Sequence, residues 1–128
     1  MAVHYVDNKK FLQSLIEYKA LCDEADLSGK PHPRISNYIG ECFMKIAEHH
    51  SRLHNFIGYQ FRDDMIADAI ENCLRYFRNF DPAKSENPFA YFSQIVYYAF
   101  LRKITKEKTQ LYLKYKATEQ FGILDEGE

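Results

Sequence analysis

Apolar residues recur at intervals of three and four along most of this chain, which is the spacing of helices that bury one face. The pattern predicts four helices: residues 8–23, residues 37–53, a third from residue 60 to the NFDPAKSENP segment, and residues 88–116. Apolar and polar residues never alternate for long, and β-branched residues are scarce, so no strand is predicted. The expected fold is therefore all-α, a compact bundle of about four helices.

Local signals set the ends of these helices. The first helix must stop before Gly29, Pro31 and Pro33, because none of these suits a helix interior. Ser36 has the side chain of an N-cap for the second helix. Asn87 has the same role in the fourth, with a proline at the first helical position.

The periodicity also predicts which side of each helix is buried. The expected core positions are Phe11, Leu12, Leu15, Ile16 and Leu21; Ile39, Phe43, Ile46 and Ala47; Met65, Ile66, Ala69, Ile70, Cys73, Leu74 and Phe77; and Phe89, Phe92, Val96, Ala99 and Phe100, with Lys103 at the end of that arc.

The opposite arc of the fourth helix should face solvent, yet it is not the usual mixture of lysine and glutamate. It holds Tyr91, Gln94, Tyr98, Leu101, Arg102 and Thr105. Aromatic rings beside amides and a cation can stack unpaired bases and hold phosphates. The same tyrosines could equally pack on another helix or another protein, and the stripe alone leaves both interpretations open.

Composition and charge refine this picture. The chain has 128 residues, which fits one domain, and its net charge of −1 does not indicate a general polycation. Residues 99–116 nevertheless hold the basic residues Arg102, Lys103, Lys106, Lys108, Lys114 and Lys116, whereas residues 117–128 hold four acids and no base. This segregation indicates two surfaces with different partners, or only a solvated helix end followed by a solubilising tail.

Other site classes find little support in the sequence. The three cysteines are odd in number and far apart, so we interpret Cys22, Cys42 and Cys73 as core residues in a reducing compartment. His50 and His54 have metal-binding spacing but lack an evident third ligand. No nucleophile–base pair, phosphate loop, signal peptide or membrane span is legible. We therefore expect a non-catalytic intracellular protein without cofactor or metal.

The stretch from residue 63 to residue 92 resembles region 2 of bacterial sigma factors. The resemblance rests on Asp64, Ile66, Asp68, Phe80 and Asp81, followed by Phe89, Tyr91, Phe92, Ile95 and Tyr98. A narrower resemblance, over residues 7–116, is to the late-transcription sigma factors of T4-like bacteriophages. Its motifs are DNK at residues 7–9, IAE at 46–48, NFxGY at 55–59, MIADxIE at 65–71, NFD at 79–81 and NPxAY at 87–91.

The resemblance implies that the third helix docks on the β′ clamp helices of the host RNA polymerase core. It assigns this contact to Asp64, Asp68 and Asn72, which share a helix face, together with Met65. From the residues alone, Asp64 could instead only balance the helix dipole.

The resemblance also implies that the fourth helix recognises and melts a −10-type promoter element. The implied DNA contacts are Phe89, Tyr91, Gln94, Tyr98, Arg102, Lys103 and Lys106. An aromatic pocket would offset the unstacking of a captured base, and the cations would hold the backbone. Phe89 also falls on the core arc, so a structural role for it stays open.

The resemblance gives the chain two parts, a helical domain at residues 1–116 and a flexible tail at residues 117–128. In the family a short apolar and acidic tail grips the DNA sliding clamp, and a co-activator assists. Phe121, Ile123 and Leu124 would make that contact here, although a disordered end is the simpler interpretation. The implied location is the cytoplasm of the infected bacterial host. The alternative function is a helical adaptor or anti-sigma-like protein that does not touch DNA.

Overall fold

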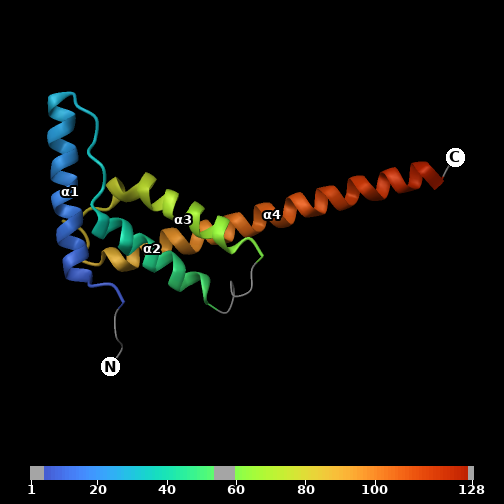
Figure 1. Ribbon diagram of the computed structural model, residues 1–128, viewed down its shortest axis with the longest axis horizontal. Helices are drawn as coiled ribbons and strands as arrows, with labels where there is room; N and C mark the ends of the chain where they lie inside the picture. The colour runs from blue at the N-terminus through green and yellow to red at the C-terminus, as the bar shows by residue number, and fades with distance from the viewer. Residues whose placement is uncertain (1–4, 54–59, 127–128) are drawn as a thin grey trace.

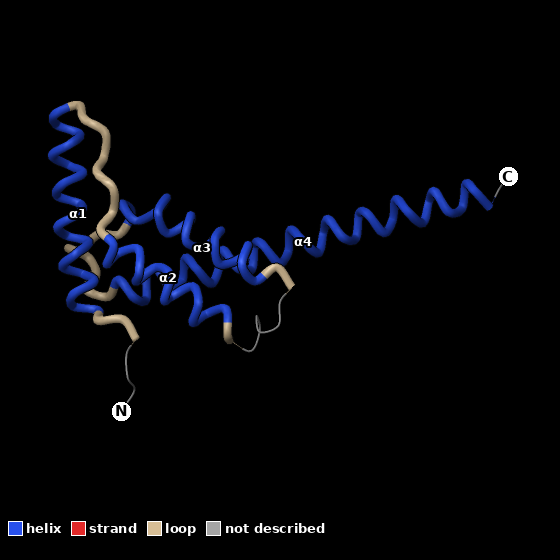
Figure 2. The backbone as a smooth tube through the Cα atoms, in the orientation of Figure 1, coloured by secondary structure: helices blue, strands red, loops and turns tan. Residues whose placement is uncertain are grey.

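The computed structural model describes residues 5–53 and 60–126, and for residues 121–126 only the course of the backbone. Four α-helices follow one another: α1 (Asn8–Ser28), α2 (Asn37–Ser51), α3 (Arg62–Tyr76) and α4 (Pro88–Glu126). A 3₁₀ turn, η1 (Phe77–Asn79), extends α3. No strand occurs among the described residues (Figure 2), so the all-α prediction is confirmed.

The helix ends confirm the predicted caps. The Ser36 hydroxyl accepts a hydrogen bond from the Ile39 N–H at 3.3 Å, and the Asn87 side chain accepts one from the Ala90 N–H at 3.0 Å. Gly29 ends α1 in the left-handed conformation, at φ 67°, which a residue without a side chain adopts at little cost. These local signals fix the end of α1 and the starts of α2 and α4 because they depend on neighbouring residues alone.

The helices α2 and α3 lie along the inner half of α4, and α1 crosses the end of this layer at a steep angle (Figure 1). Three buried rings join the layers, since Phe92 of α4 lies 4.8 Å from Phe43 of α2 and 5.6 Å from Phe11 of α1, measured between ring centroids. All three side chains are fully buried. Offset and tilted ring pairs of this kind add to the stabilisation that their buried area provides.

The start of α4 is tied to the start of α1 by two hydrogen bonds of the Asn8 side chain. The Asn8 side chain donates to the Asn87 Oδ1 at 2.9 Å, and its own oxygen accepts from the Phe89 N–H at 3.0 Å. Asn8 therefore satisfies one of the backbone N–H groups that the first turn of α4 leaves without a helical partner.

The predicted core is right for α2 and, apart from Phe89, for the apolar positions of the inner half of α4, and partly wrong for α1 and α3. In α1 the buried residues are Phe11, Leu15, Tyr18 and Cys22, whereas Ile16 and Leu21 are exposed. The buried residues are spaced at intervals of four, three and four, and Ile16 and Leu21 each lie one position away from a residue of this stripe. Tyr18 was missed because it is amphipathic: its ring is buried while its hydroxyl donates to the Pro33 carbonyl at 2.6 Å.

In α3 the fully buried residues are Met65, Ala69 and Cys73. Leu74, which we expected in the core, is 40% exposed because it lies off the stripe that these three residues define. Phe89 of α4 is only partly buried. The three cysteines are free thiols and buried, as predicted, and burial raises the pKa of Cys73 to about 12.

The helix α4 runs to Glu126, ten residues past the predicted end at Lys116. The change from basic to acidic composition had indicated a separate tail, but charge alone does not stop a helix, and residues 117–126 contain alanine, glutamate and glutamine and no proline. Residues 108–126, which we call the arm, project beyond the bundle (Figure 1), and every side chain from 108 to 120 is exposed.

Candidate nucleic-acid interface

An open groove of about 460 Å³ lies between α3 and the inner half of α4. It is lined by Asn72, Arg75 and Tyr76 from α3 and by Gln94, Ile95, Tyr98 and Arg102 from α4. The lining holds two guanidinium groups, two phenol rings and two amides, and no carboxylate. The α3–α4 groove therefore combines surfaces for stacking, cations for phosphates and amides for base edges.

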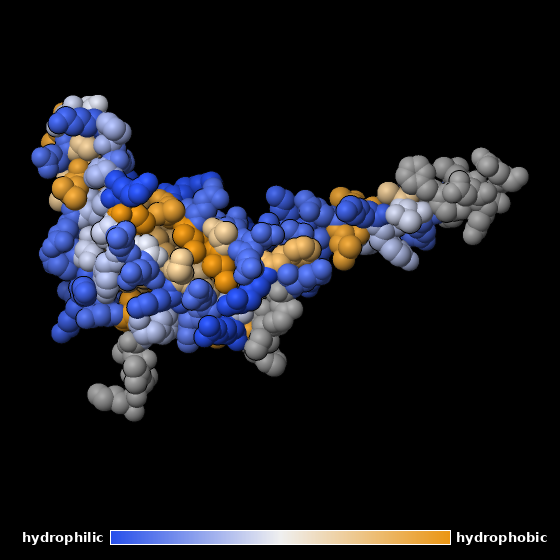
Figure 3. Space-filling model, viewed as in Figure 1, coloured by the Kyte–Doolittle hydropathy of each residue, from blue (hydrophilic) through white to orange (hydrophobic). Residues whose placement is uncertain are grey.

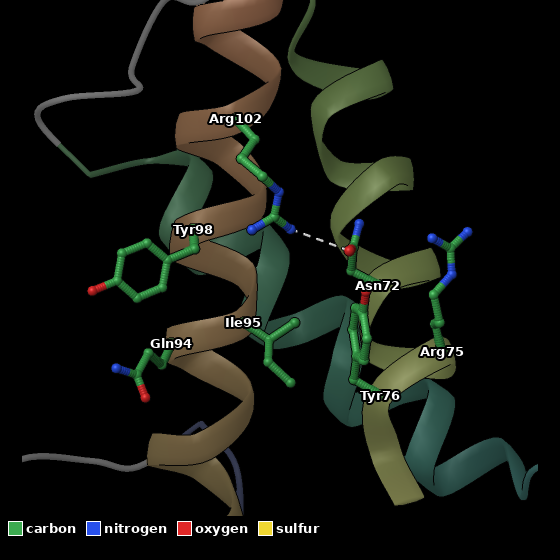
Figure 4. Close-up of a pocket in the computed structure, with 7 residues that line it drawn as sticks. All are labelled: Asn72, Arg75, Tyr76, Gln94, Ile95, Tyr98 and Arg102. Carbon is green, nitrogen blue, oxygen red and sulfur yellow. Dashed lines mark hydrogen bonds between the residues drawn. The ribbon is translucent and has the colours of Figure 1, made fainter. Parts of the chain in front are cut away.

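The helices α3 and α4 run antiparallel, which brings the end of one beside the start of the other (Figure 1). The Tyr91 hydroxyl of α4 donates to the Tyr76 carbonyl of α3 at 3.2 Å, and a turn or more further out Arg102 donates to the Asn72 Oδ1 at 3.2 Å. Figure 4 shows this second bond crossing the groove, with Ile95 directed toward α3 below it. These two bonds hold the groove walls in register.

Tyr98 and Gln94 point away from α3, on the outer side of α4 (Figure 4). Tyr98 is 50% exposed, and its ring meets the edge of the Tyr97 ring at 5.7 Å between centroids. A ring that is half exposed can accept a flat partner on its free side. Tyr98 and Gln94 thus occupy the positions that the solvent-facing arc predicted for them.

Tyr91 was predicted on that solvent-facing arc, but the structure places it in a structural role. Its ring is partly buried against Phe80 at 5.3 Å, its hydroxyl is used by Tyr76, and burial raises its pKa. Phe89 lies outside the groove as well and lines a separate pocket of about 540 Å³ at the starts of α1 and α4. Neither ring contributes to the groove lining.

The two predicted lysine contacts differ in their surroundings. Lys103 lies on the side of α4 away from the groove, where its ammonium group is 3.5 Å from the carboxylate of Glu107. Lys106 is exposed at the base of the arm, one turn past Arg102. Of this pair, Lys106 is the cation positioned to extend the charge of the groove.

The predicted polymerase-binding residues of α3 separate into exposed and internal positions. Asp64 is exposed, and Asp68 is partly exposed one turn further along. Asn72 is used within the molecule: it donates to the Asp68 carbonyl at 2.8 Å and accepts from Arg102. Met65 is fully buried in the core, where its side chain is covered. The surface that α3 offers to a partner therefore carries Asp64 and Asp68, without Met65.

Some of the sequence predictions lie outside the described residues. The NFxGY motif at residues 55–59 and His54 belong to this part of the chain, and the side chains of Phe121, Ile123 and Leu124 are not described although their backbone continues α4. Among the described residues, no three histidine, cysteine or acidic side chains converge as a metal site would require, and none of the helices is long and apolar enough to cross a membrane.

Sequence reasoning missed the contribution of Arg75 and Tyr76, two of the seven residues that line the groove. They occupy the last turn of α3, and their periodicity marks them only as positions near the edge of the buried stripe. The available signal was the short loop between the third and fourth helices, because such loops join antiparallel neighbours and bring the last turn of one beside the first turns of the next.

Comparison with known proteins does not assign the chain to a family: no family model and no curated protein sequence matches it. The functional interpretation therefore rests on the residues and on the groove geometry.

Proposed function

We propose that this protein is a small sigma factor of the phage late-transcription type, which binds the host RNA polymerase core through α3 and recognises a −10-type promoter element through α4. The observation that carries the proposal is the α4 wall of the α3–α4 groove, where Tyr98 and Gln94 present a ring and an amide on the outer side of α4 and Arg102, beside them, turns its cation toward Asn72 of α3. A base flipped from the promoter would stack on a ring and donate or accept at the amide, while the cation holds its phosphate.

Reconstituted transcription tests the DNA-binding part of the proposal. Purified protein and bacterial core polymerase should give specific transcripts from an AT-rich template that carries only a −10 element. The double variant Tyr98→Ala with Arg102→Ala should lower this activity about tenfold or more, because it removes a stacking surface and a phosphate contact. If transcription persists at the original level, this surface of α4 does not engage the promoter.

The matched control removes the same chemistry outside the groove. Tyr115→Ala with Lys114→Ala also deletes a phenol ring and a cation from exposed positions of α4, and both residues lie on the arm. This control should retain its transcription activity. An equal loss in both double variants would show a general effect on the helix and would count against the groove.

The polymerase contact is proposed for the acidic surface of α3. Asp64 and Asp63 both lie in the first turn of α3, so reversing either charge costs the same favourable interaction with the helix dipole. They point to different sides of the helix, and only Asp64 shares a face with Asp68. Asp64→Lys and Asp68→Lys should abolish pull-down of core polymerase, while Asp63→Lys should not. Unaltered binding by Asp64→Lys and Asp68→Lys would contradict the docking assignment.

The end of the arm is proposed to bind a DNA sliding clamp through Phe121, Ile123 and Leu124, which stand in an acidic sequence. The test compares transcription with and without the clamp, using the full-length chain and a chain cut after Lys116. The clamp should stimulate the full-length chain only. Equal stimulation of both chains would place the clamp contact elsewhere.

A helical adaptor that does not touch DNA is the second candidate, and one observation favours it. The arm exposes Leu111, Leu113 and Tyr115, each at least 60% exposed, and apolar patches stand among hydrophilic residues along it in Figure 3. Exposed apolar side chains often mark protein contacts. If the protein binds core polymerase but supports no promoter-dependent transcription, the adaptor is favoured over the sigma factor.

A further inference from the structure

One face of α4 carries the same chemistry from the groove out along the arm. At about 100° per residue, the residues within an arc of about 120° opposite the buried side are polar or aromatic over some six turns, except for Leu101. They form what we call the outer strip: Gln94, Tyr98, Arg102, Thr105, Lys108, Thr109, Tyr112 and Lys116. The strip is about 33 Å long at a rise of about 1.5 Å per residue.

The outer strip holds cations and rings without a carboxylate among them. The nearest acids of α4 are Glu107, which lies toward the other side and pairs with Lys103, and Glu119, which lies past the end of the strip and is 3.6 Å from Lys116. Tyr112 is 58% exposed, close to the 50% of Tyr98. Two comparable rings thus stand along one face, with Arg102 and Lys108 between them.

Thr109 gives the strip a hydrogen-bond acceptor, and the Lys116 side chain gives it a donor. The Thr109 hydroxyl donates to the Thr105 carbonyl at 2.9 Å, inside the same helix, which leaves the hydroxyl oxygen able to accept from a base. The Lys116 ammonium group lies 5.7 Å from the centre of the Tyr112 ring. Because the Lys116–Glu119 pair is exposed, it contributes little and can yield to a phosphate.

The apolar residues of the arm lie beside the outer strip, and they do not form an unbroken packing stripe. Leu111 and Tyr115 share one flank, Leu113 lies on the other flank, and Lys108 interrupts the first flank between Leu111 and the bundle. The strip itself carries two rings, Tyr98 and Tyr112, and three cations, Arg102, Lys108 and Lys116. Rings and cations on one face match surfaces that follow a nucleic-acid strand by stacking and charge.

We infer that the outer strip binds single-stranded nucleic acid that leaves the α3–α4 groove and follows α4 onto the arm, an inference that rests on the proposed function. Tyr98 and Tyr112 serve as two stacking platforms about 21 Å apart along the helix. Arg102 and Lys108 hold the backbone between them. The bound strand therefore covers more nucleotides than the groove alone accommodates.

Binding of labelled oligothymidylates of two lengths to the full-length chain tests this inference. An oligonucleotide of about 3 nucleotides is too short to span the two rings and should reach one platform, whereas one of about 12 nucleotides should reach both, within the roughly 4–16 nucleotides that such surfaces cover. The longer probe should bind at least about tenfold more tightly than the shorter one, and Tyr112→Ala should remove this gain while leaving the short probe unaffected.

A matched pair of lysine variants separates the strip from general charge. Lys108 and Lys114 are both exposed on the arm, but Lys114 lies roughly on the opposite side of the helix. Lys108→Ala should lower the slope of log affinity against log salt for the long probe by about 0.7, the value for one phosphate contact with a single strand. Lys114→Ala should lower it much less.

The outcomes distinguish the inference from the proposed function. If Tyr98→Ala weakens binding of the short probe but Tyr112→Ala and Lys108→Ala leave the long probe unchanged, the strip is wrong and the groove stands. If neither probe binds the native chain, or if Tyr98→Ala leaves the binding of both probes unchanged, both are wrong. A dimer in sedimentation that disappears with Leu111→Ala and leaves DNA binding independent of Lys108 would assign the arm to self-association and overturn the inference.

Discussion

The inner half of α4, residues 88–104, packs one face against the other helices, whereas residues 108–120 of the arm are exposed at every position. Phe92, Val96 and Phe100 each lose all contact with solvent in the inner half. The arm has no such packing and depends on the helix propensity of its lysine, glutamine and leucine residues and on local pairs such as Lys116–Glu119. One continuous helix is thus stabilised by tertiary contacts in one half and by local preference in the other.

This difference has a functional meaning because isolated helices are marginal in water. A sequence under no demand beyond folding gains little from extending a helix about 28 Å past the bundle. The inner half positions the groove rigidly, since its outer face is fixed by what the inner face packs against. The arm lacks that rigidity, and in the proposed function its length provides reach along a bound strand.

The largest expected difference between the two halves is in global stability. Phe92→Ala should lower the free energy of unfolding by about 3–5 kcal/mol, because it removes a ring that contacts Phe11 of α1, Phe43 of α2 and Phe80 of the loop before α4, and leaves a cavity. Tyr112→Ala in the arm should change it by less than about 0.5 kcal/mol. Urea denaturation measures both. A comparable loss in both variants would mean that the arm packs on the bundle after all.

The cap at the start of α4 should give the next largest effect. Asn87→Ala removes the acceptor for the Ala90 N–H and for the Asn8 side chain, and should cost about 1 kcal/mol, at most about 2. Asn87→Ser keeps a capping oxygen and should recover part of this loss in the same denaturation experiment. No loss in the alanine variant would show that the inner half needs no cap beyond its packing.

A smaller effect should appear as a pH dependence confined to the bundle. Burial lowers the pKa of His50 below its ordinary value of 6.5, although its Nδ1 lies 3.0 Å from the Ile46 carbonyl. As the pH falls through 6.5, this histidine becomes protonated in the unfolded chain before it does so in the folded chain. Protonation therefore favours the unfolded chain, and stability declines until the pH passes below the lowered pKa of the folded state. Thermal melts from pH 7.5 to pH 5 should show a shallower decline in His50→Gln than in the native chain. Identical slopes would contradict the assignment.

The smallest change in global stability is expected from a proline in the arm. Gln110→Pro should disrupt the helix locally and reduce the helical circular dichroism signal. The thermal midpoint of the bundle should change no more than it does for an ordinary surface substitution. A large drop in the midpoint would show that the two halves of α4 unfold as one unit. That result would remove the contrast between them.

The sequence predicted those features that depend on a single helix and its neighbours in the chain. Ser36 and Asn87 were identified as caps because an N-cap bonds three residues ahead, and the buried face of α2 followed from its period. The groove needed knowledge of which helices are adjacent, so its α4 wall was predicted while Arg75 and Tyr76 were not. Tyr91 was misplaced for the same reason, since its partner Tyr76 lies on another helix.

The amide pair between Asn8 and Asn87 has a consequence for how the chain folds. It joins residues that are 79 positions apart, so the chain between them must be ordered before the pair can close. Contacts between neighbouring helices form sooner, because they close shorter loops. We therefore expect this pair to form after the transition state for folding. It should then slow unfolding without speeding folding, so that it stabilises the folded bundle kinetically.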